Sequence, residues 1–491
     1  MATRSAGKSL RHLALTLATP LAFVVPVSPA LGAGDSFIVP PGDSSLVEPV
    51  SREIPRPSAL QRDVDFWIRV YSEITTLQGL IHDERHLGVV YETLDLALAG
   101  PLGSSQRREL ITRARKRWIA GLDAAVFALK AGTAGSVNGD ALRVLQLWGE
   151  DATPARLREA RAEIRFQLGQ ADRFRAGIVR SGTWESFIAQ TFNALGLPRE
   201  LVALPHVESS FTPTAYSKVG ASGLWQFMPS TGRLFMRVDD IVDERLDPLR
   251  STEAAAKLLL RNYRLLGSWP LAITAYNHGP GGMNRAKRTL GTDDFAVIAR
   301  NYRSFSFGFA SRNFYPSFLA ALTIDNEPQK YFPDVTRAPE IRFHEIAMPG
   351  YVNIKTLEKT LMVPMDELRT LNPALRPAVW SGEKFVPRNY RLRLPPEWAI
   401  SPKEFIAKIG ADQIYVTQIG PRAHKVGRGE TLRQVARKYG ITVRRLAELN
   451  GLKPSAKLKR GRVLQLPGGR PQTLAELSTQ SPAAATADSR P

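Results

Sequence analysis

Glu208 is the residue of this sequence best suited to proton transfer. It is the only acid in the stretch 204–211, which reads LPHVESSF. Pro198 and Glu200 indicate a helix start, since proline favours the first helical position and an acid the first turn. Glu208 would then lie near the end of that helix, where the helix dipole and apolar neighbours both disfavour a carboxylate. We therefore expect a raised pKa, which suits a general acid, although for a single Glu an acid that merely closes a helix is the more common case.

A glycine-rich block follows Glu208 and could line a cleft for a sugar chain. It runs from Gly220 to Thr231 and reads GASGLWQFMPST. Its two glycines allow the backbone to approach a ligand closely. Gln226 and Met228 share one side of the segment if it is extended. Trp225 and Phe227 offer flat apolar surfaces. Ordinary core packing is the alternative for Trp225, Phe227 and Met228.

A third block, Ala275–Gly279, reads AYNHG and adds more polar groups. A glycine at this place is typical of a helix end, so Tyr276 and Asn277 would deliver a phenol and an amide to one place. Ser217, between the first two blocks, adds a hydroxyl. An acid surrounded by amides, a phenol and aromatic surface could bind a glycan and protonate a glycosidic oxygen.

These three blocks, in this order, resemble the soluble lytic transglycosylase (SLT) family between about residues 181 and 320. The matching motifs are ESSF at Glu208, GxxGLWQFMPxT from Gly220 and AYNxG from Ala275. The layout of the chain resembles the membrane-bound murein transglycosylase D type within that family. The resemblance implies a lysozyme-like catalytic domain, mainly α with some α+β character, that cleaves the glycan strands of peptidoglycan.

The resemblance also implies roles for individual residues. It makes Glu208 the sole acid/base, and it places substrate-binding groups at Ser217, Gln226, Met228, Tyr276 and Asn277. The family's fourth motif usually has Tyr-Val before a proline, whereas this chain has Phe314-Tyr315-Pro316. Moving the phenol by one residue turns it by about 100° around a helix. Either Tyr315 reaches the substrate through a shifted backbone, or the phenol is missing from the site.

In the implied reaction, Glu208 protonates the oxygen between N-acetylmuramic acid (MurNAc) and N-acetylglucosamine (GlcNAc). The MurNAc acetamide stabilises the positive centre, and Glu208 then takes the proton from the C6 hydroxyl, which closes a 1,6-anhydro ring without water. This lyase reaction needs no cofactor and no metal. Two alternatives stay open, namely a muramidase that hydrolyses the same bond and a non-catalytic scaffold that only binds peptidoglycan.

Two other groups of residues could change this assignment. A downstream cluster of acids could contain a second catalytic carboxyl: Asp239, Asp240, Asp243, Glu244 and Asp247. The density of these acids after a helix favours a solvated loop instead. His206 and His278 lack a third ligand at a suitable spacing, which argues against a metal site.

A second module, over residues 422–467, has the pattern strand, helix, helix, strand. Thr431 suits a helix cap, and Asn450-Gly451 suits the turn that ends the second helix. This βααβ unit resembles a LysM domain. The resemblance implies a shallow groove for GlcNAc between two loops, formed by Gly429, Glu430, Thr431, Leu432, Asn450, Gly451 and Leu452. Glu430 replaces the usual Asp, which puts only the hydrogen bond of its turn in question.

Residues 340–398 contain a weaker copy of this pattern. The sequence Leu-x-x-Leu-Asn at 446–450 recurs at 368–372, and the Leu-x-Leu-Pro ending recurs as well. The Gly-Glu-Thr-Leu turn is missing, so we expect a degenerate LysM-like module that acts as a spacer rather than as a sugar-binding unit. The tail at 468–491 is rich in Ala, Ser, Pro and Gln, which predicts disorder.

The N-terminus reads as an export signal. Three basic residues precede the apolar run 13–27, and Ala30-Leu31-Gly32 offers small residues for cleavage. The run is short and contains two prolines, so a cleavable signal peptide over 1–32 is favoured over a membrane anchor. The sequence has no cysteine, which excludes a cysteine-linked lipoprotein and disulfides. We therefore expect an exported protein of the periplasm or cell envelope, and a peripheral association with the membrane or the wall stays open.

Spacing and composition complete the domain plan. Residues 33–58 read as a linker, 59–180 as a helical N-terminal domain with a long solvated helix over 155–174, and 181–325 as the catalytic domain. The expected fold class is therefore mainly α, with a lysozyme-like catalytic domain and small βααβ modules after it.

The chain is strongly basic, with 66 Lys and Arg against 46 Asp and Glu, which gives a formal charge of +20. Such a charge attracts polyanions in general. The basic residues are scattered and lack a reading motif, which together with the export signal argues against nucleic acid. We expect peptidoglycan glycan strands as the partner and a monomeric protein.

Overall fold

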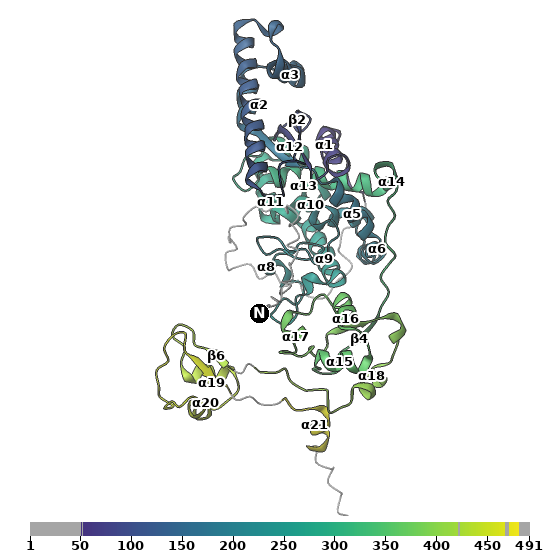
Figure 1. Ribbon diagram of the computed structural model, residues 1–491, viewed down its shortest axis with the longest axis vertical. Coiled ribbons are helices and arrows are strands. Elements are labelled where there is room, and N and C mark those ends of the chain that lie inside the picture. Colours follow the sequence, from purple (N-terminus) through teal and green to yellow (C-terminus); the bar gives the residue numbers. More distant parts are fainter. Residues whose placement is uncertain (1–50, 52, 421–422, 467–470, 481–491) are drawn as a thin grey trace, which may run out of the picture. The chain divides into compact units, whose positions relative to one another are not determined.

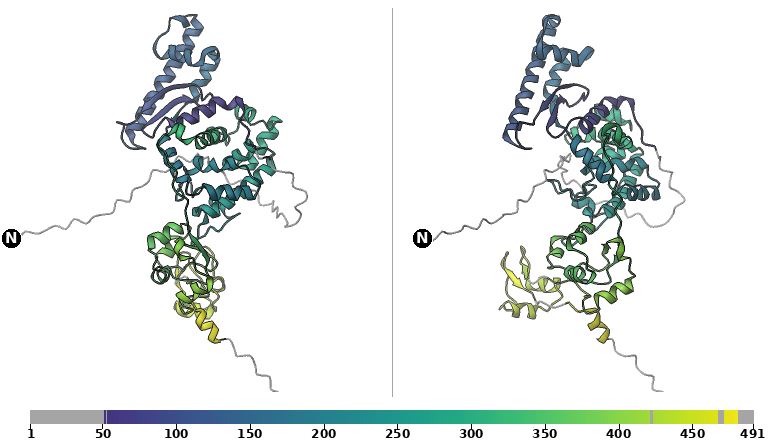
Figure 2. Two further views of the ribbon diagram at one scale, coloured as in Figure 1. Left: turned by 90° about the vertical axis from the view of Figure 1, so that its right-hand side faces the viewer. Right: turned by 45° about the vertical axis from the view of Figure 1, so that its right-hand side comes forward.

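The computed structural model describes residues 51, 53–420, 423–466 and 471–480, so the expected signal peptide and most of the expected linker lie outside the described residues. These residues fall into two compact units. The first comprises the chain up to Val238 together with Glu244–Ile341, and the second comprises Asp239–Asp243 and the chain from Arg342 onward. Helices dominate both units (Figures 1 and 2), which confirms the mainly α fold class.

The core of the first unit is a group of packed helices. They are α1 (Gln61–Ser72), α5 (Ala171–Ser181), α6 (Glu185–Ala194), α7 (Leu204–Ser209), α8 (Pro229–Gly232), α9 (Pro248–Leu266), α10 (Trp269–His278), α11 (Pro280–Leu290), α12 (Phe295–Asn301), α13 (Phe309–Asn326) and α14 (Pro328–Tyr331). α13 is buried along most of its length and packs against α1, α7 and α10.

Helix α1 belongs to this core although the sequence places it in a separate N-terminal domain. It packs on α13 and α5, and its Trp67 and Val70 are fully buried with residues of the expected catalytic domain. The amphipathic spacing of 64–71 predicts the helix but not its partner. A domain boundary at residue 180 would therefore cut through one hydrophobic core.

Residues 78–168 form a second, smaller core that includes a sheet, so the N-terminal region is not all helical. Strands β1 (Gln78–Asp83), β2 (Val90–Asp95) and β3 (Ile164–Leu168) form an antiparallel sheet in the order β2-β1-β3. Helices α2 (Ser105–Ala131), α3 (Gly139–Trp148) and α4 (Pro154–Glu163) pack with it. In Figure 1, α2 and α3 lie together, beside β2.

The sequence predicts one long solvated helix over 155–174, and this prediction is wrong. α4 ends at Glu163, and the chain continues directly as β3, whose Gln167 pairs with Leu80 of β1. Gly79 permits this pairing, because a Cβ at that position would lie 2.2 Å from the Phe166 ring. The sheet therefore depends on a close approach between segments more than 80 residues apart.

The second unit contains two βααβ modules. The first has β4 (His344–Ala347), α15 (Ile354–Leu361), α16 (Met365–Leu371) and β5 (Arg391–Leu394), with an additional short helix, α17 (Pro377–Trp380), before β5, and is followed by α18 (Pro402–Ile409). The second has β6 (Ala423–Lys425), α19 (Leu432–Lys438), α20 (Val443–Leu449) and β7 (Val463–Gln465). In each module the two strands pair antiparallel, β4 with β5 and β6 with β7.

The two modules share one set of side-chain hydrogen bonds, made by an Asn after the second helix. Asn450 donates to the carbonyls of Leu446 and Gln465 at 2.8 Å each, and accepts from the Gln465 amide at 2.6 Å. Asn372 makes the same three bonds with the residues at the matching positions, Leu368 and Arg393. In both modules, an Asn thus ties the end of the second helix to the last strand.

Part of the C-terminal tail is ordered, which corrects the expectation of disorder from residue 468 onward. Helix α21 spans Leu474–Gln480, and the Leu474 amide donates to the Ile414 carbonyl at 2.8 Å. Thr473 forms an isolated bridge with Tyr415, so the chain returns to the first βααβ module after leaving the second. None of the helices described here is long and apolar enough to cross a membrane.

Candidate active site

Glu208 lies in the last turn of α7, a short helix that continues the 3₁₀ turn Arg199–Ala203. Pro205 occupies the first turn of α7, and Leu201 and Leu204 are fully buried beneath it. The side chain of Glu208 stays partly exposed. The expected helix end is therefore present, and it holds the acid at the boundary between core and solvent.

Burial raises the pKa of Glu208 to about 8, as the sequence predicts in direction. Within the described part of the chain, no hydrogen bond to its carboxyl offsets the desolvation that disfavours the charged form. At neutral pH the carboxyl therefore keeps its proton. A protonated carboxyl with access to solvent can donate that proton to a ligand.

The turn after Glu208 is strained and held in place. Ser210 and Phe211 both have left-handed backbones, with φ of 49° and 54°, which residues with a Cβ adopt at a cost. Arg180 of α5 donates from Nε and Nη2 to the Ser210 carbonyl oxygen, at 3.1 and 2.6 Å. These two bonds fix the backbone two residues after the acid.

A buried ion network fixes α7 from the other side. His206 Nε2 lies 2.9 Å from Asp325 Oδ1, and the same carboxylate oxygen is 3.0 Å from Arg337 Nη2. Burial by itself would raise the pKa of Asp325, but the charges of His206 and Arg337 lower it overall. His206 thus has a structural partner in Asp325.

The glycine-rich block forms a tight loop next to α7. Gly223 has φ of +84°, and a Cβ there would lie 1.7 Å from the Arg245 carbonyl oxygen, so only glycine fits. Ser209 Oγ donates to the Leu224 carbonyl at 2.7 Å, which ties the helix of the acid to this loop. The glycine has the role that the spacing predicts, a close approach, although here the backbone approaches another part of the chain.

Gln226 is the one residue of this loop other than glycine that has a left-handed backbone, with φ of 47°. Its Nε2 donates to the Gly223 carbonyl at 2.8 Å. Its Oε1 is buried and, in the part of the chain that the structure describes, has no hydrogen-bond partner. A buried carbonyl oxygen of this kind can accept a hydrogen bond from a bound ligand, since leaving it unpaired is costly.

The aromatic residues of the loop belong to the core rather than to a cleft surface. Trp225 is fully buried, and its indole donates to Thr252 Oγ1 at 2.8 Å. Phe227 is also buried. The ordinary alternative therefore holds for both, whereas Met228 is half-buried at the N-cap of α8.

Ser217 closes the small loop before Gly220. Its Oγ accepts from the Ala221 amide, and its own amide donates to the Ala221 carbonyl, both at 2.8 Å. This residue therefore shapes the loop in addition to any contact with a ligand.

Tyr276 and Asn277 lie at the end of α10, which terminates at His278 before Gly279, as predicted. The Tyr276 hydroxyl donates to the Trp225 carbonyl at 2.9 Å, so α10 is tied to the glycine-rich loop. Burial and then the charge of Glu208 raise the pKa of Tyr276. Asn277 is half-buried beside it.

Tyr315 does not bring its phenol to this site. Its ring is fully buried, and its hydroxyl donates to the carbonyl of Pro55, near the start of the described chain. Phe314, at the position where the family motif has tyrosine, has no hydroxyl. The one-residue shift along α13 thus directs the phenol to another neighbour, as the geometry of a helix requires.

Tyr71 of α1 lies near the acid, and the sequence motifs do not identify it as a residue of the site. It is buried, and the charge of Glu208 contributes to raising its pKa, after burial. Its apolar spacing with Val64 and Trp67 reads as ordinary core. No local signal relates it to a residue more than 130 positions away.

The downstream acids and His278 have structural roles. Asp239 accepts from the amides of Ile241 and Val242, and Asp247 caps α9. Glu244 accepts from the Arg237 amide at 2.6 Å. Desolvation lowers the pKa of His278 to about 4, and its Nδ1 lies 3.0 Å from Ser311 Oγ. These observations favour the interpretation of the acidic cluster as a loop.

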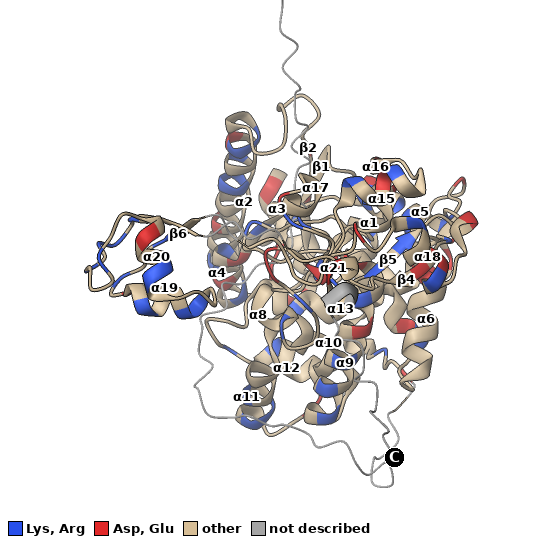
Figure 3. Ribbon diagram, turned by 90° about the horizontal axis from the view of Figure 1, so that it is seen from below, with Lys and Arg blue, Asp and Glu red and all other residues tan. Residues whose placement is uncertain are grey.

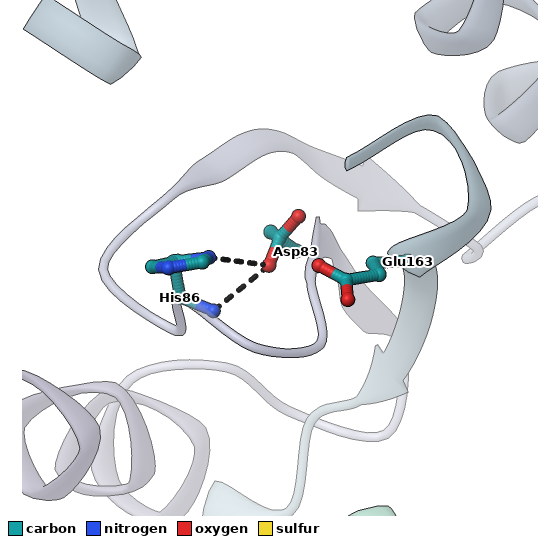
Figure 4. Close-up of side chains that lie close together, drawn as sticks. All are labelled: Asp83, His86 and Glu163. Atoms are coloured by element: carbon teal, nitrogen blue, oxygen red, sulfur yellow. Dashed lines mark hydrogen bonds and ion pairs between the residues drawn. The ribbon is translucent and has the colours of Figure 1, made fainter. Parts of the chain in front are cut away.

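A separate group in the first unit brings three potential metal ligands together. Asp83, His86 and Glu163 each place one ligand atom within 4.8 Å of the others (Figure 4). Asp83 Oδ1 accepts from the His86 amide and lies 3.1 Å from His86 Nδ1, which closes the turn after β1. Arg85 lies 3.5 Å from Glu163, so a guanidinium already supplies positive charge there. The group is therefore accounted for as a turn and an ion pair.

The loops of the second βααβ module carry the candidate sugar-binding residues. Glu430 Oε2 accepts from the Gly427 amide at 2.6 Å and lies 2.8 Å from His424 Nε2, so the longer acid still makes the bond of its turn. Thr431 forms a capping box with Gln434 at the start of α19. Gly429 and Gly451 have φ of +75° and +60°, Asn450 forms the hydrogen bonds described above, Leu452 is half-buried, and Leu432 is buried in the module core.

In the first βααβ module, the corresponding loops form backbone hydrogen bonds with other segments of the chain. The segment Asp239–Asp243 runs along the loop after α16, where the Asp243 amide donates to the Ala374 carbonyl at 2.8 Å and the Arg376 amide to the Ile241 carbonyl at 3.0 Å. Tyr351, in the loop after β4, exchanges backbone bonds with Tyr415 at 2.8 Å each. The two loops that would form a sugar groove are thus paired with backbone.

Comparison with known protein families supports two of these assignments. Residues 186–298 match the family described as the transglycosylase SLT domain, and residues 424–467 match the LysM domain. The resemblance to both families that the motifs indicate is confirmed. The SLT match contains Glu208, Gln226 and Asn277, but neither Tyr71 nor Tyr315.

Known proteins with similar sequences agree with these families. The membrane-bound lytic murein transglycosylase D of Escherichia coli K12 is 28% identical over 302 residues, which cover 59% of this chain and 65% of that protein. The chain therefore spans less than two thirds of that relative. The peptidoglycan transglycosylase gp16 of phage T7 is 38% identical over 20% of this chain and 8% of its own length. A putative tributyltin chloride resistance protein of Alteromonas sp. M-1 is 37% identical over 20% of this chain and 49% of its own.

Among solved structures, the soluble lytic transglycosylase SLT70 of Escherichia coli overlaps with the chain in part. The alignment covers 47% of this chain and 44% of SLT70, at 17% identity and a TM-score of 0.26. An overlap this low carries no conclusion about the arrangement of the site.

Proposed function

We propose that this protein is a lytic transglycosylase that cleaves the β-1,4 bond between MurNAc and GlcNAc in peptidoglycan. The observation that carries the proposal is Glu208, an acid with a pKa of about 8 at a fixed helix end inside the region that matches the SLT domain. The names of the relatives agree with this reaction class.

Glu208 acts first as the acid. It gives its proton to the glycosidic oxygen while the C1–O bond breaks, so the GlcNAc side leaves with a hydroxyl. The acetamide carbonyl of MurNAc stabilises the positive charge at C1, in the role that a second carboxylate has in most glycosidases. Asn277 and Gln226 are the nearby amides that can orient this acetamide and the sugar.

Glu208 then acts as the base. The carboxylate takes the proton from the MurNAc C6 hydroxyl, whose oxygen bonds to C1 and closes the 1,6-anhydro ring. Glu208 is thereby returned to its protonated state, and no water is consumed. A single carboxyl suffices for both steps, consistent with the structural roles of the downstream acids Asp239, Glu244 and Asp247.

The LysM domain is proposed to hold the enzyme on the wall through GlcNAc, at the loops 429–432 and 450–452. The module at 344–394 is proposed to be a spacer, because backbone segments are paired with its corresponding loops. Basic residues lie on helices of both units, among them α2 and α19 (Figure 3). They add a general attraction to the anionic wall. This function requires export, as the N-terminal sequence predicts.

The product of digestion tests the proposal. Purified sacculi treated with the protein should release fragments that end in 1,6-anhydroMurNAc, which mass spectrometry distinguishes from reducing MurNAc by the loss of one water. Reducing ends would instead identify a muramidase. The absence of any release, with retained binding, would identify a non-catalytic scaffold.

A further inference from the structure

Tyr71 lies outside the SLT domain in sequence and inside the same core in space. It sits near the end of α1 and is 2% exposed. α1 packs against α13 and α5, and both of these helices also pack against α7, which carries Glu208. The residue therefore lies where the helices around the acid converge.

A stack of rings connects Tyr71 to the helix of the acid. Its ring stacks on Phe174 of α5, with 4.9 Å between centroids and 23° between planes. Phe174 in turn stacks on His206, at 4.6 Å and 21°. His206 precedes Glu208 by two residues on α7. The stack fixes the ring of Tyr71 relative to the helix that carries the acid.

The hydroxyl end of Tyr71 lies beside Ser317 of α13 and within the electrostatic reach of Glu208. Ser317 follows Phe314 by three positions, so both side chains share one face of α13. Phe314 occupies the place of the family tyrosine and lacks a hydroxyl. The phenol of Tyr71 thus reaches α13 on the face where the family motif would supply one.

The other two phenols near this region have backbone partners. Tyr315 donates to Pro55, and Tyr276 donates to Trp225. Both carbonyls would be left without these bonds if the hydroxyls turned toward Glu208. Among the described residues, the Tyr71 hydroxyl has no such backbone acceptor and lies beside the Ser317 hydroxyl, so it can redirect its proton at lower cost.

We propose that Tyr71 is a positioning residue for Glu208, whose hydroxyl donates a hydrogen bond to the Glu208 carboxylate after the acid has given up its proton. This inference rests on the proposed function. Between the two steps of the reaction, Glu208 is a carboxylate in a site that disfavours charge. A neutral phenol compensates for part of that cost without taking the proton, and the hydrogen bond ends when Glu208 is protonated again by the C6 hydroxyl.

The test compares two hydroxyls that differ only in their neighbours. Tyr71→Phe removes the proposed donor and keeps the ring stack, whereas Tyr315→Phe removes the hydroxyl that bonds to Pro55. The Glu208 carboxyl is followed by ¹³C NMR titration in the full chain, with Glu208→Gln to assign the signal. Tyr71→Phe should raise the apparent pKa of Glu208 by about one unit, since a hydrogen bond to a charged group is lost. Tyr315→Phe should leave it unchanged.

Turnover gives a second readout. Tyr71→Phe should lower kcat by about ten- to a hundredfold with little change in KM, because the bond forms only after proton transfer. Adding Phe314→Tyr to this variant supplies a phenol from the family position and should restore part of kcat. A double variant as slow as the single one would show that Glu208 does not depend on a phenol.

The titration and the digestion separate the two proposals. An unchanged Glu208 titration in Tyr71→Phe would overturn the role of Tyr71, even if the wild-type protein releases anhydro ends. A shifted titration in a protein that releases no such ends would support the contact between the two residues and reject the proposed function. The NMR titration needs no substrate, so it remains decisive in either case.

Discussion

Arg180 binds the carbonyl oxygen of Ser210 with two hydrogen bonds and thereby holds the strained turn directly after Glu208. The guanidinium comes from α5, before the region that matches the SLT domain. It does not need to touch substrate to affect the reaction. In the proposed reaction, the angle at which Glu208 meets the glycosidic oxygen depends on this turn.

Arg180→Met should lower kcat by about tenfold or more, because small displacements of a catalytic group slow the reaction strongly. It should also lower Tm, since the Ser210 carbonyl loses a charged donor. Arg175→Met, at an exposed position of the same helix, is the matched control. Equal activity of the two variants would mean that Arg180 does not position the acid.

Glu208→Gln should lose activity by about 10²- to 10⁴-fold, which is the usual contribution of acid/base catalysis. The amide keeps the size of the side chain but cannot transfer the proton. Release of soluble fragments from sacculi measures the loss. Glu200→Gln, in the 3₁₀ turn before α7, should retain activity. Turnover near that of the wild type in Glu208→Gln would refute the assignment of Glu208 as the acid/base.

The pH dependence of kcat/KM should follow the raised pKa of Glu208. The free enzyme needs the protonated acid, so the rate should decline as the pH rises through about 8. An ordinary glutamic acid would already have lost its proton near pH 4.3. An alkaline limb near pH 4 to 5, measured with a soluble glycan fragment, would contradict a buried and protonated Glu208.

The same pKa predicts a stability effect. A carboxyl whose pKa is higher in the folded protein binds its proton more tightly when folded, so the free energy of unfolding falls as the pH rises from about 4.5 to about 8. Glu208→Gln has no charge to bury and should be more stable than the wild type at pH 8. We expect about 1 to 3 kcal/mol after allowance for solvent screening, and no gain near pH 4. Thermal melts at both pH values measure the difference.

The two βααβ modules should differ in sugar binding. Replacing residues 422–467 by a short flexible linker should reduce pelleting of the protein with sacculi and leave cleavage of soluble fragments intact. GlcNAc oligomers should bind the intact chain at two sites, the LysM loops and the proposed active site, and the shortened chain at the proposed active site alone. A second site in the shortened chain would assign sugar binding to the module at 344–394.

The sequence predicts the site best where the chemistry lies within one motif. Glu208, Gln226 and Tyr276 each belong to a block whose local structure fits the prediction, and hydrogen bonds from Ser209 and Tyr276 tie these blocks together. Tyr71 and Arg180 could not be found in this way, since their proposed roles depend on contacts between segments that are distant in sequence. Helical spacing marks Tyr71 as core and says nothing about which neighbour its hydroxyl meets.

The sheet of the N-terminal region was not predicted for a related reason. β1 and β3 pair across more than 80 residues, and the Arg- and Glu-rich stretch before β3 favours a helix up to Glu163. Local helix propensity therefore predicts that the helix continues past Glu163. In the structure it ends there, because the next residues pair with the distant strand β1. Likewise, the composition of the C-terminal tail predicts disorder, whereas α21 is ordered with segments near Ile414.

The packing of α1 on α13 sets where a stable fragment of the enzyme can begin. A recombinant protein that starts at Ser181, as the domain boundary expected from the sequence suggests, would lack Trp67, Val70 and Phe174 and expose the apolar face of α13. It would also lack Tyr71 and Arg180. A soluble fragment suited to crystallisation with glycan ligands should instead start before Ser51, which bonds to Trp269 and Tyr263, and end after Ile341.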